Sequence, residues 1–335
     1  MRRAGNLVSK VSDMDNLLLA FHKAAKGKRH KQEVEEYSEN LENNLYRLSI
    51  QIEQGNVSVG DYKYFYIKDP KLRMICAASF PERVLHHAIM NVCHEVFERH
   101  FIHTTYATRP GKGVYSALDR ACKAMKKYPY VCKFDVRHYF DSIDHTILKK
   151  KLCRLFKDKM LLQIFFKIID SYERTEKNKG LPIGNLTSQY FANYYLSDFD
   201  HWCKETLHIG EYVRYMDDFL VFHSDYSQVA ICNKTINNYM TSNLDLQLKP
   251  MVFANTAQGV SFLGYHISKT KILLNSRSKH RLQTKMSLYE KLFEDNVWSS
   301  REYTEHITPL LSFSRYAYSK GLRSRIIEKW QQMKG

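Results

Sequence analysis

The stretch Glu211–Phe222 reads EYVRYMDDFLVF and places two adjacent aspartates, Asp217 and Asp218, between runs of apolar and β-favouring residues. This pattern predicts two short strands joined in a tight hairpin. The turn carries Met216 and both aspartates, and it contains neither glycine nor the Asn-Gly or Asp-Gly pair of the easy hairpin turns. A non-glycine residue held in a strained turn often serves a site, so this hairpin is the first candidate site.

The charge of this turn indicates a metal ion. Two carboxylates at the tip of an apolar hairpin cannot both lose their water without a compensating cation. Mg²⁺ is the natural choice, because it takes hard oxygen ligands and keeps positions for water and phosphate. The alternative is a solvated turn, since aspartate is common in turns. The tetrapeptide Tyr215–Asp218, YMDD, favours the metal, because it resembles the catalytic hairpin of reverse transcriptases.

The composition favours a nucleic-acid partner. The 335 residues are 44% hydrophobic, and 51 lysines and arginines against 35 aspartates and glutamates give a formal charge of +16. Such an excess indicates a polyanionic partner, and aromatic residues among basic ones suit stacking on bases. A generally basic soluble protein is the alternative.

The seven cysteines form no Cys-x-x-Cys pair and are odd in number. This favours free thiols in a reducing compartment over a zinc module or a disulfide framework. No sufficient apolar run follows the basic start of the chain, so no signal peptide is expected. The longest apolar stretch, Met160–Ile169, is too short to span a bilayer. We therefore expect a cytoplasmic protein that does not enter a membrane.

Residues 1–60 predict helices. Asp15–Ala25 and Glu33–Glu53 carry apolar residues at helical spacing, and Gly55 ends the second helix. The strands Tyr62–Ile67 and Leu72–Ala77 follow and predict a second hairpin.

In the reverse-transcriptase resemblance, this second hairpin is the fingers hairpin. Its cations Lys71 and Arg73 would hold the triphosphate of the incoming nucleotide. Fixed cations stabilise the charge that develops on phosphates during transfer. Lysine and arginine are otherwise common in hairpins, so this role depends on the other motifs.

A turn-rich basic loop, Thr105–Gly113, lies between predicted helices over Phe80–Phe97 and Val114–Lys127. A glycine-rich loop with Arg109 and Lys112 before a helix N-terminus can hold phosphate. We expect this loop to contact a nucleic-acid backbone, and a plain connection is the alternative.

A third carboxylate, Asp135, stands near the end of the predicted strand Tyr130–Val136. Two divalent ions about 4 Å apart need several carboxylates, and such a pair can activate a 3′-hydroxyl and stabilise leaving pyrophosphate. Asp141 and Asp144 compete for this role, but both fit better as residues that begin the next helix. The predicted ligands of two Mg²⁺ ions are Asp135, Asp217 and Asp218.

The segment Asp135–Phe140 resembles the reverse-transcriptase pattern of an aspartate followed five residues later by an aromatic. The resemblance implies that the backbone carbonyl of Val136 completes the metal shell. It also implies that Phe140 is a steric gate. A flat ring against the sugar leaves a 2′-hydroxyl neither space nor partner, which favours deoxynucleotides.

The stretch Gly180–Asn193, GLPIGNLTSQYFAN, resembles the template- and nucleotide-positioning loop of reverse transcriptases. Ile183 stands where that loop usually has glutamine, and Gln189 where it has proline. The form I/L/V-G-x-x-x-S-Q resembles reverse transcriptases of diversity-generating retroelements. That family copies a template RNA into cDNA with errors concentrated at template adenines, and the cDNA replaces a variable repeat in a target gene.

Isoleucine gives a partial physical reason for low fidelity. Glutamine can donate and accept hydrogen bonds to a nucleotide, whereas Ile183 can do neither. A pocket without polar contacts discriminates poorly, because a mismatch no longer leaves a buried group unpaired. The predicted nucleotide contacts are Lys71, Arg73, Phe140, Ile183, Gly184, Gln189, Tyr215 and Met216.

The C-terminal third predicts a helix over Asp225–Ser242, a strand over Leu244–Lys249 and a hairpin over Gly259–Ile267. Phe262–Tyr265, FLGY, resembles the primer-grip hairpin, where Gly264 would let backbone approach the primer. Three basic helices follow, the last over Leu322–Lys334, and they suit a thumb that rides a duplex backbone. The predicted primer and template contacts are Arg109, Lys112, Phe262, Leu263, Gly264, Tyr265, Arg277, Lys279 and Arg281.

Together the motifs imply an α+β right-hand polymerase fold, with an antiparallel palm sheet backed by helices. We expect fingers with N-terminal helices over residues 1–75, a palm with interleaved fingers segments over 76–272, and a helical thumb over 273–335.

The expected function is RNA-directed DNA synthesis. The resemblance implies as partners a structured template RNA, RNA/DNA and DNA duplexes, deoxynucleoside triphosphates and a small basic oligomeric accessory protein. Two alternatives stay open: another bacterial reverse transcriptase, defence-associated or intron-derived, and a non-catalytic scaffold that binds RNA. The presence of all three aspartates disfavours the scaffold.

Overall fold

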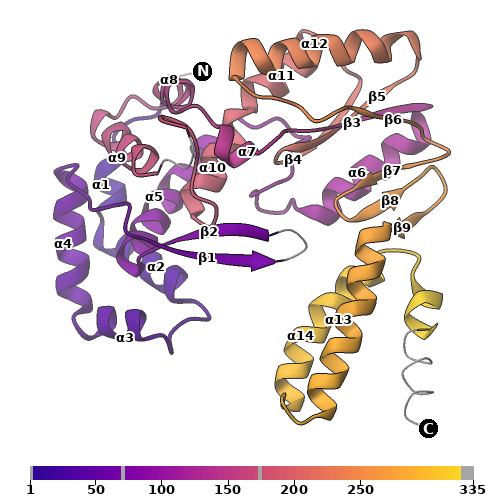
Figure 1. The fold of residues 1–335 in the computed structure, drawn as a ribbon. Coiled ribbons are helices and arrows are strands. Elements are labelled where there is room, and N and C mark those ends of the chain that lie inside the picture. Colours follow the sequence, from indigo (N-terminus) through magenta and orange to yellow (C-terminus); the bar gives the residue numbers. More distant parts are fainter. Residues whose placement is uncertain (1–2, 69–71, 173–175, 326–335) are drawn as a thin grey trace. The chain divides into compact units, whose positions relative to one another are not determined.

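A computed structural model describes residues 3–68, 72–172 and 176–325 (Figure 1). The chain forms two compact units, each assembled from three separate segments. The segments are Met1–His103, Val136–Leu207 and Lys234–Lys249 in the first unit, and Thr104–Asp135, His208–Asn233 and Pro250–Gly335 in the second. The fold mixes helices and antiparallel sheet, as predicted.

The first unit is mostly helical. Its elements are α1 (Val8–Val11), α2 (Met14–Ala25), α3 (Gln32–Glu39), α4 (Leu41–Glu53), β1 (Tyr62–Lys68), β2 (Leu72–Ala78), α5 (Phe80–Glu98), α7 (Tyr139–Ser142), α8 (His145–Leu155), α9 (Lys159–Asp170), α10 (Leu186–Tyr195) and α11 (Ser197–Glu205). The helix α5 is buried along most of its length, with α2 and α10 packed against it. Near its end, Phe97 meets Phe156 and Tyr194 with ring centroids 5.5 Å apart in each pair.

The predicted second hairpin is confirmed as the antiparallel ribbon β1–β2, paired from Tyr62↔Ala78 to Lys68↔Leu72. Figure 1 shows it extending from the helices of the first unit. Lys71 lies outside the described residues, and Arg73 is exposed on β2.

The single helix predicted over Glu33–Glu53 is wrong, because Asn40 separates α3 from α4. Asn40 has φ −121° and ψ 40°, outside helical geometry. Asparagine competes for local backbone hydrogen bonds and so favours helix ends. The break lets Tyr37 of α3 pack on Phe80, with ring centroids 5.3 Å apart.

The second unit holds the larger sheet. Its elements are α6 (Val114–Lys127), β3 (Tyr130–Asp135), β4 (Glu211–Tyr215), β5 (Asp218–His223), β6 (Val252–Asn255), β7 (Val260–Phe262), β8 (Tyr265–Ile267), β9 (Ile272–Leu274), α13 (Ser276–Glu294) and α14 (Ser300–Arg315), while α12 (Ser227–Leu244) is shared between the units. The larger sheet has strand order β4-β5-β3-β6, and a smaller one has the order β7-β8-β9. All pairings in both sheets are antiparallel.

One face of the larger sheet carries the core of the second unit. Val131 of β3, Val213 of β4 and Leu220 of β5 share this face and cluster with α6 and with β7–β9. Because side chains alternate along a strand, Lys133 and Asp135 lie on the same face as Val131. The face therefore runs from an apolar core to charged residues at the end of β3.

The strand predicted over Leu244–Lys249 is wrong. Leu244 ends α12, and Leu248 makes only an isolated bridge to Val136. Asp245 has φ +51°, a left-handed conformation that ends the helix, and Pro250 cannot donate to a strand ladder. The strand that joins the sheet is β6.

The helices predicted on either side of this region are confirmed as α12, α13 and α14. Most of the predicted helix over Leu322–Lys334 lies outside the described residues. Among the residues described here, no helix has the length and apolar character needed to cross a lipid bilayer.

Asp144 is the N-cap of α8, because its Oδ1 accepts from the Ile147 N–H at 2.8 Å. We expect Asp144→Ala to lower the free energy of unfolding by about 1 kcal/mol, measured by chemical denaturation. Asp144→Asn is the matched control and should be nearly neutral, since asparagine caps equally well. An Asp144→Asn variant as strongly destabilised as Asp144→Ala would contradict this capping role.

Candidate active site

The YMDD stretch forms the predicted hairpin. The strands β4 and β5 pair from Glu211↔Phe222 to Tyr215↔Asp218. The turn therefore consists of Met216 and Asp217 alone, and Asp218 is the first residue of β5 rather than part of the turn. Met216 has φ +57°, in the left-handed region that favours glycine. The strain expected from the turn's composition is present, at the residue before the aspartates.

A buried arginine supports this strained turn. Arg214 of β4 is fully buried, and its Nη1 donates to the Met216 carbonyl at 2.9 Å. Its backbone N–H donates to Thr104 O and its carbonyl accepts from the Tyr106 N–H, both at 3.0 Å. Sequence reasoning missed Arg214. The available signal was one cation between apolar residues of a predicted buried strand, where a charge needs a specific partner.

The third carboxylate lies beside the hairpin. Asp135, the last residue of β3, is the direct cross-strand partner of Asp218. Directly opposed residues have Cβ atoms about 4.5–5.5 Å apart and point to the same face. The register is held by Phe134 and Phe219 on the opposite face, whose rings stack with centroids 5.0 Å apart. The structure thus brings Asp135 and Asp218 together and leaves Asp217 next to them in the turn.

The environment of Asp218 disfavours its ionised form. Burial raises the pKa of Asp218 from 3.8 to about 7, and the neighbouring Asp135 and Asp217 act in the same direction. Lys133 opposes them, with its Nζ 2.9 Å from Asp218 Oδ2. The other oxygen, Oδ1, is buried and has no hydrogen-bond partner among the described residues. A buried carboxylate oxygen of this kind calls for a cation.

These residues fit Mg²⁺ by chemistry, because they supply hard carboxylate oxygens at one end of a sheet. Within the described parts of the chain, no three His, Cys, Asp or Glu side chains stand close enough to form a ready ligand cluster. The cross-strand pair Asp135–Asp218 is in register, and Asp217 lies next to Asp218 in the chain. Val136, the next residue after Asp135, is buried, and the role of its carbonyl stays a prediction.

The predicted nucleotide loop is attached to the ribbon that carries Arg73. The Cys76 N–H of β2 donates to the Ile183 carbonyl at 2.8 Å. Gly184 has φ +125°, and a Cβ there would stand 3.0 Å from Ile75 Cγ2 and 3.1 Å from Cys76 O. Any side chain at this position would disturb the contact, which explains the glycine.

Other predicted nucleotide contacts lie on separate elements. Gln189 is exposed on α10, Phe140 is half-buried in α7, and Tyr215 is half-buried at the end of β4.

The FLGY segment forms the predicted hairpin between β7 and β8, but its aromatic side chains face inward. Phe262 and Tyr265 are fully buried, and the Tyr265 hydroxyl donates to Phe313 O at 2.7 Å. Gly264 has φ +90°, and a Cβ there would lie 2.8 Å from Phe313 Cζ. Packing on α14 therefore explains this glycine. Only the turn at Leu263 and Gly264 is accessible enough to touch a primer.

The predicted basic contacts differ in their exposure to solvent. Arg109 Nη1 donates to Thr105 O at 2.9 Å, and Lys112 lies over the Tyr106 ring at 5.1 Å. These two cations therefore help to order their own loop. By contrast, α13 presents exposed cations at Arg277, Lys279 and Arg281.

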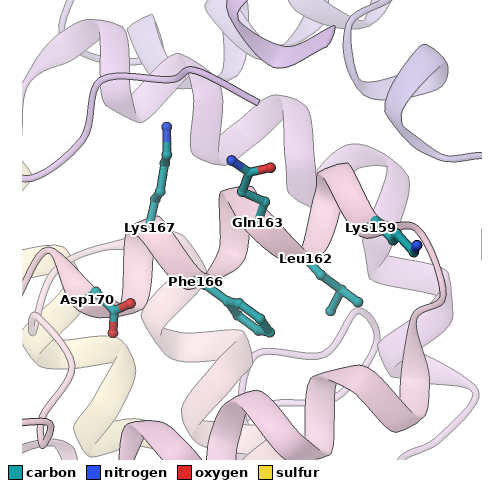
Figure 2. Close-up of a pocket in the computed structure, with 6 residues that line it drawn as sticks. All are labelled: Lys159, Leu162, Gln163, Phe166, Lys167 and Asp170. Carbon is teal, nitrogen blue, oxygen red and sulfur yellow. The ribbon is translucent and has the colours of Figure 1, made fainter. Parts of the chain in front are cut away.

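A hollow of about 340 Å³ lies on α9. Figure 2 shows that all its lining side chains project from this one helix. They are Lys159, Leu162, Gln163, Phe166, Lys167 and Asp170. None of these six residues is a predicted site residue.

We expect Asp218→Asn to stabilise the protein at about pH 8 when no divalent ion is present. The pKa of Asp218 is higher in the folded chain, so its ionised form destabilises the fold as pH rises from about 4 to about 7. The gain in stability should be visible as a higher melting temperature of the variant at about pH 8. The difference in melting temperature should become smaller toward about pH 5.

Added Mg²⁺ should make the unmodified protein more stable than Asp218→Asn, because an ion that binds the folded state stabilises the protein that keeps the carboxylate ligand. A variant no more stable than the unmodified protein at any pH would contradict this account of Asp218.

Comparison with known proteins agrees with this geometry. The family model of reverse transcriptase (RNA-dependent DNA polymerase) matches residues 67–267, more than half of the chain. Protein YkfC of Escherichia coli is 22% identical over 246 residues, which cover 60% of this chain and 64% of YkfC. The putative COX1/OXI3 intron 1 protein of Saccharomyces cerevisiae is 20% identical over 334 residues, covering 80% of this chain and 40% of that protein.

The chain spans less than two thirds of the length of these curated relatives. Among solved structures, apo telomerase from Candida tropicalis has a TM-score of 0.51 and 12% identity, covering 65% of this chain and 49% of that one. This likeness concerns the fold alone. With the family model matched across the YMDD hairpin and Asp135, the chain belongs to the reverse transcriptase family.

Proposed function

We propose that this protein is a Mg²⁺-dependent RNA-directed DNA polymerase that copies a structured template RNA into cDNA. The observation that carries the proposal is the cross-strand pair Asp135–Asp218 beside Asp217 in the YMDD turn. We assign fingers to residues 1–75, palm to 76–272 and thumb to 273–335.

The carboxylates would hold two metal ions. Asp135 and Asp218 offer oxygens from facing strands, Asp217 adds one from the turn, and the Val136 carbonyl completes the set. Mg²⁺ bound there would activate the primer 3′-hydroxyl and stabilise the leaving pyrophosphate. The support from this chain is the buried, unbonded Oδ1 of Asp218, together with the link from Arg214 to the turn.

The residues that we expect to select the nucleotide lie in the first unit. Arg73, with Lys71, would hold the triphosphate, and Phe140 would exclude a 2′-hydroxyl. The hydrogen bond from the Cys76 N–H of β2 to the Ile183 carbonyl supports this assignment, because it attaches the loop to the ribbon that carries Arg73. The exposed cations of α13 would follow the duplex backbone.

We further propose that the protein serves a diversity-generating retroelement and is error-prone at template adenines. The support is the sequence Ile183–Gln189, IGNLTSQ, in the positioning loop. A small basic accessory protein and a structured RNA with the template repeat would be its partners. An intron-derived reverse transcriptase is the second candidate, favoured by similarity to the intron 1 and intron 2 proteins of yeast COX1/OXI3.

Asp135→Ala and Asp217→Ala should each abolish cDNA synthesis, because each removes a metal ligand. The assay supplies a primed RNA template of mixed sequence, Mg²⁺ and four deoxynucleotides. If the purified chain alone makes no product, the assay is repeated with the cognate RNA and the accessory protein. RNA affinity should stay within about threefold, since neither aspartate supplies attraction to phosphate. Asp225→Ala is the matched control, because Asp225 is an exposed carboxylate beyond the other end of β5.

Full synthesis by either metal-ligand variant would overturn the site. No synthesis by the unmodified protein under both conditions would favour the RNA-binding scaffold.

Ile183→Gln should reduce misincorporation, because glutamine restores polar contacts that a mismatch leaves unpaired. Ile183→Leu is the control and should keep the original error rate, since it conserves the apolar character. Sequencing the cDNA gives the error frequency at each template base. Clustering at adenines supports the retroelement role, whereas accurate copying supports the intron-derived candidate. An unchanged error spectrum in Ile183→Gln would remove Ile183 from the explanation.

A further inference from the structure

Lys133 stands between the catalytic carboxylates and the strand that leads into the FLGY turn. It lies in β3, two residues before Asp135, so the two side chains share one face of the sheet. Its backbone is held on both sides, by Leu220 of β5 and Val252 of β6. The stem of Lys133 is therefore fixed by a central strand rather than by a mobile edge.

One ammonium group joins two sites. Lys133 Nζ lies 2.9 Å from Asp218 Oδ2 and 2.9 Å from the carbonyl oxygen of Ser261. Ser261 is the middle residue of β7, directly before Phe262. The side chains of Lys133 and Asp218 are 19% and 18% exposed, so this ion pair is largely shielded from water. Both hydrogen bonds are charge-assisted, which makes them short and directional.

This contact is a polar link between two sheets. The strand pairings place β7 in the smaller sheet and Asp218 in the larger one. Apolar packing also joins the sheets, through the core cluster that contains Val260, Phe262 and Leu220. Apolar packing has no preferred direction, whereas an ammonium that donates to two oxygens fixes their separation.

We propose that Lys133 is a positioning residue that aligns the Asp218 carboxylate with the primer-contacting hairpin. This inference rests on the proposed polymerase function. The resemblance to the primer-grip hairpin implies that the FLGY turn would contact the primer end, and Asp218 would hold a metal ion that activates the 3′-hydroxyl at that end. Lys133 keeps the two in register through Ser261 O and Asp218 Oδ2. A misplacement of about 1 Å between reacting groups can lower a reaction rate about 100-fold. A contact that fixes the distance between the two sites would therefore protect the rate.

The first test is single-turnover nucleotide addition on a primed RNA template, with Lys133→Met and Lys133→Arg. We expect Lys133→Met to slow the chemical step about 10–100-fold, as small misplacements do. Its affinities for primer–template and for deoxynucleotide should change less than about threefold, because Lys133 is not aimed at phosphate. Arginine retains a cation that can donate to both oxygens, so Lys133→Arg should recover most of the rate.

Arg120→Met is the matched control. Arg120 makes a two-bond ion pair with Glu211, with both contacts at 2.7 Å, at the end of β4 farthest from the turn. Loss of this ion pair should lower the melting temperature without a comparable loss in the rate of nucleotide addition. A Lys133→Met enzyme as fast as the unmodified one would overturn the inference. So would a rate that falls only in proportion to lost folded protein, with no recovery in Lys133→Arg.

A second test needs no reaction and separates this inference from the proposed function. Amide hydrogen exchange should become faster in Lys133→Met over residues 215–219 and 260–264 together, and Lys133→Arg should restore protection. Unchanged exchange in both segments would overturn the link even if polymerisation is established. Paired changes would support the link even if the unmodified protein proves inactive, in which case only the polymerase proposal fails.

Discussion

The constraint on which the second unit depends is the placement of three carboxylates at one end of a sheet. Asp135 and Asp218 oppose each other across β3 and β5, and Asp217 adjoins them. Burial, together with repulsion from Asp135 and Asp217, raises the pKa of Asp218 to about 7. Such a cluster weakens the fold unless other contacts hold it. Backbone pairing holds the strands, Arg214 holds the turn, and Lys133 holds one oxygen of Asp218.

The stability that offsets this cluster comes from the same strands. Side chains alternate, so Phe134 and Phe219 stack on one face while Val131 and Leu220 join the core on the other. Full burial of one large apolar side chain contributes about 1.5–3 kcal/mol. A pKa rise of a few units is a cost of the same order as one or two such side chains. Burial of the apolar side chains of these strands therefore offsets a cost of this size.

Sequence reasoning was right where the pattern is local. Runs of apolar and β-favouring residues identified the YMDD hairpin and the β1–β2 ribbon, and helical spacing identified α5 and α12–α14. It was wrong where a single residue overrides the pattern. Asn40 divides a continuous amphipathic helix, and Asp245 and Pro250 prevent a strand over Leu244–Lys249. It also took Phe262 and Tyr265 as primer contacts, although both side chains are buried, because apolar character alone does not distinguish a core from a binding surface.

The sequence by itself determined the motifs from which the chemistry is predicted. YMDD, the aspartate that ends a predicted strand and the IGNLTSQ loop are short motifs whose residue types predict metal ligands and a nucleotide loop. Only the tertiary structure decided which atoms meet. The pairing of Asp135 with Asp218, the bond from Arg214 to Met216 O and the bridge from Lys133 to Ser261 O depend on strand register and side-chain direction. Strand register and side-chain direction are set by packing between segments distant along the chain, which local sequence patterns do not specify.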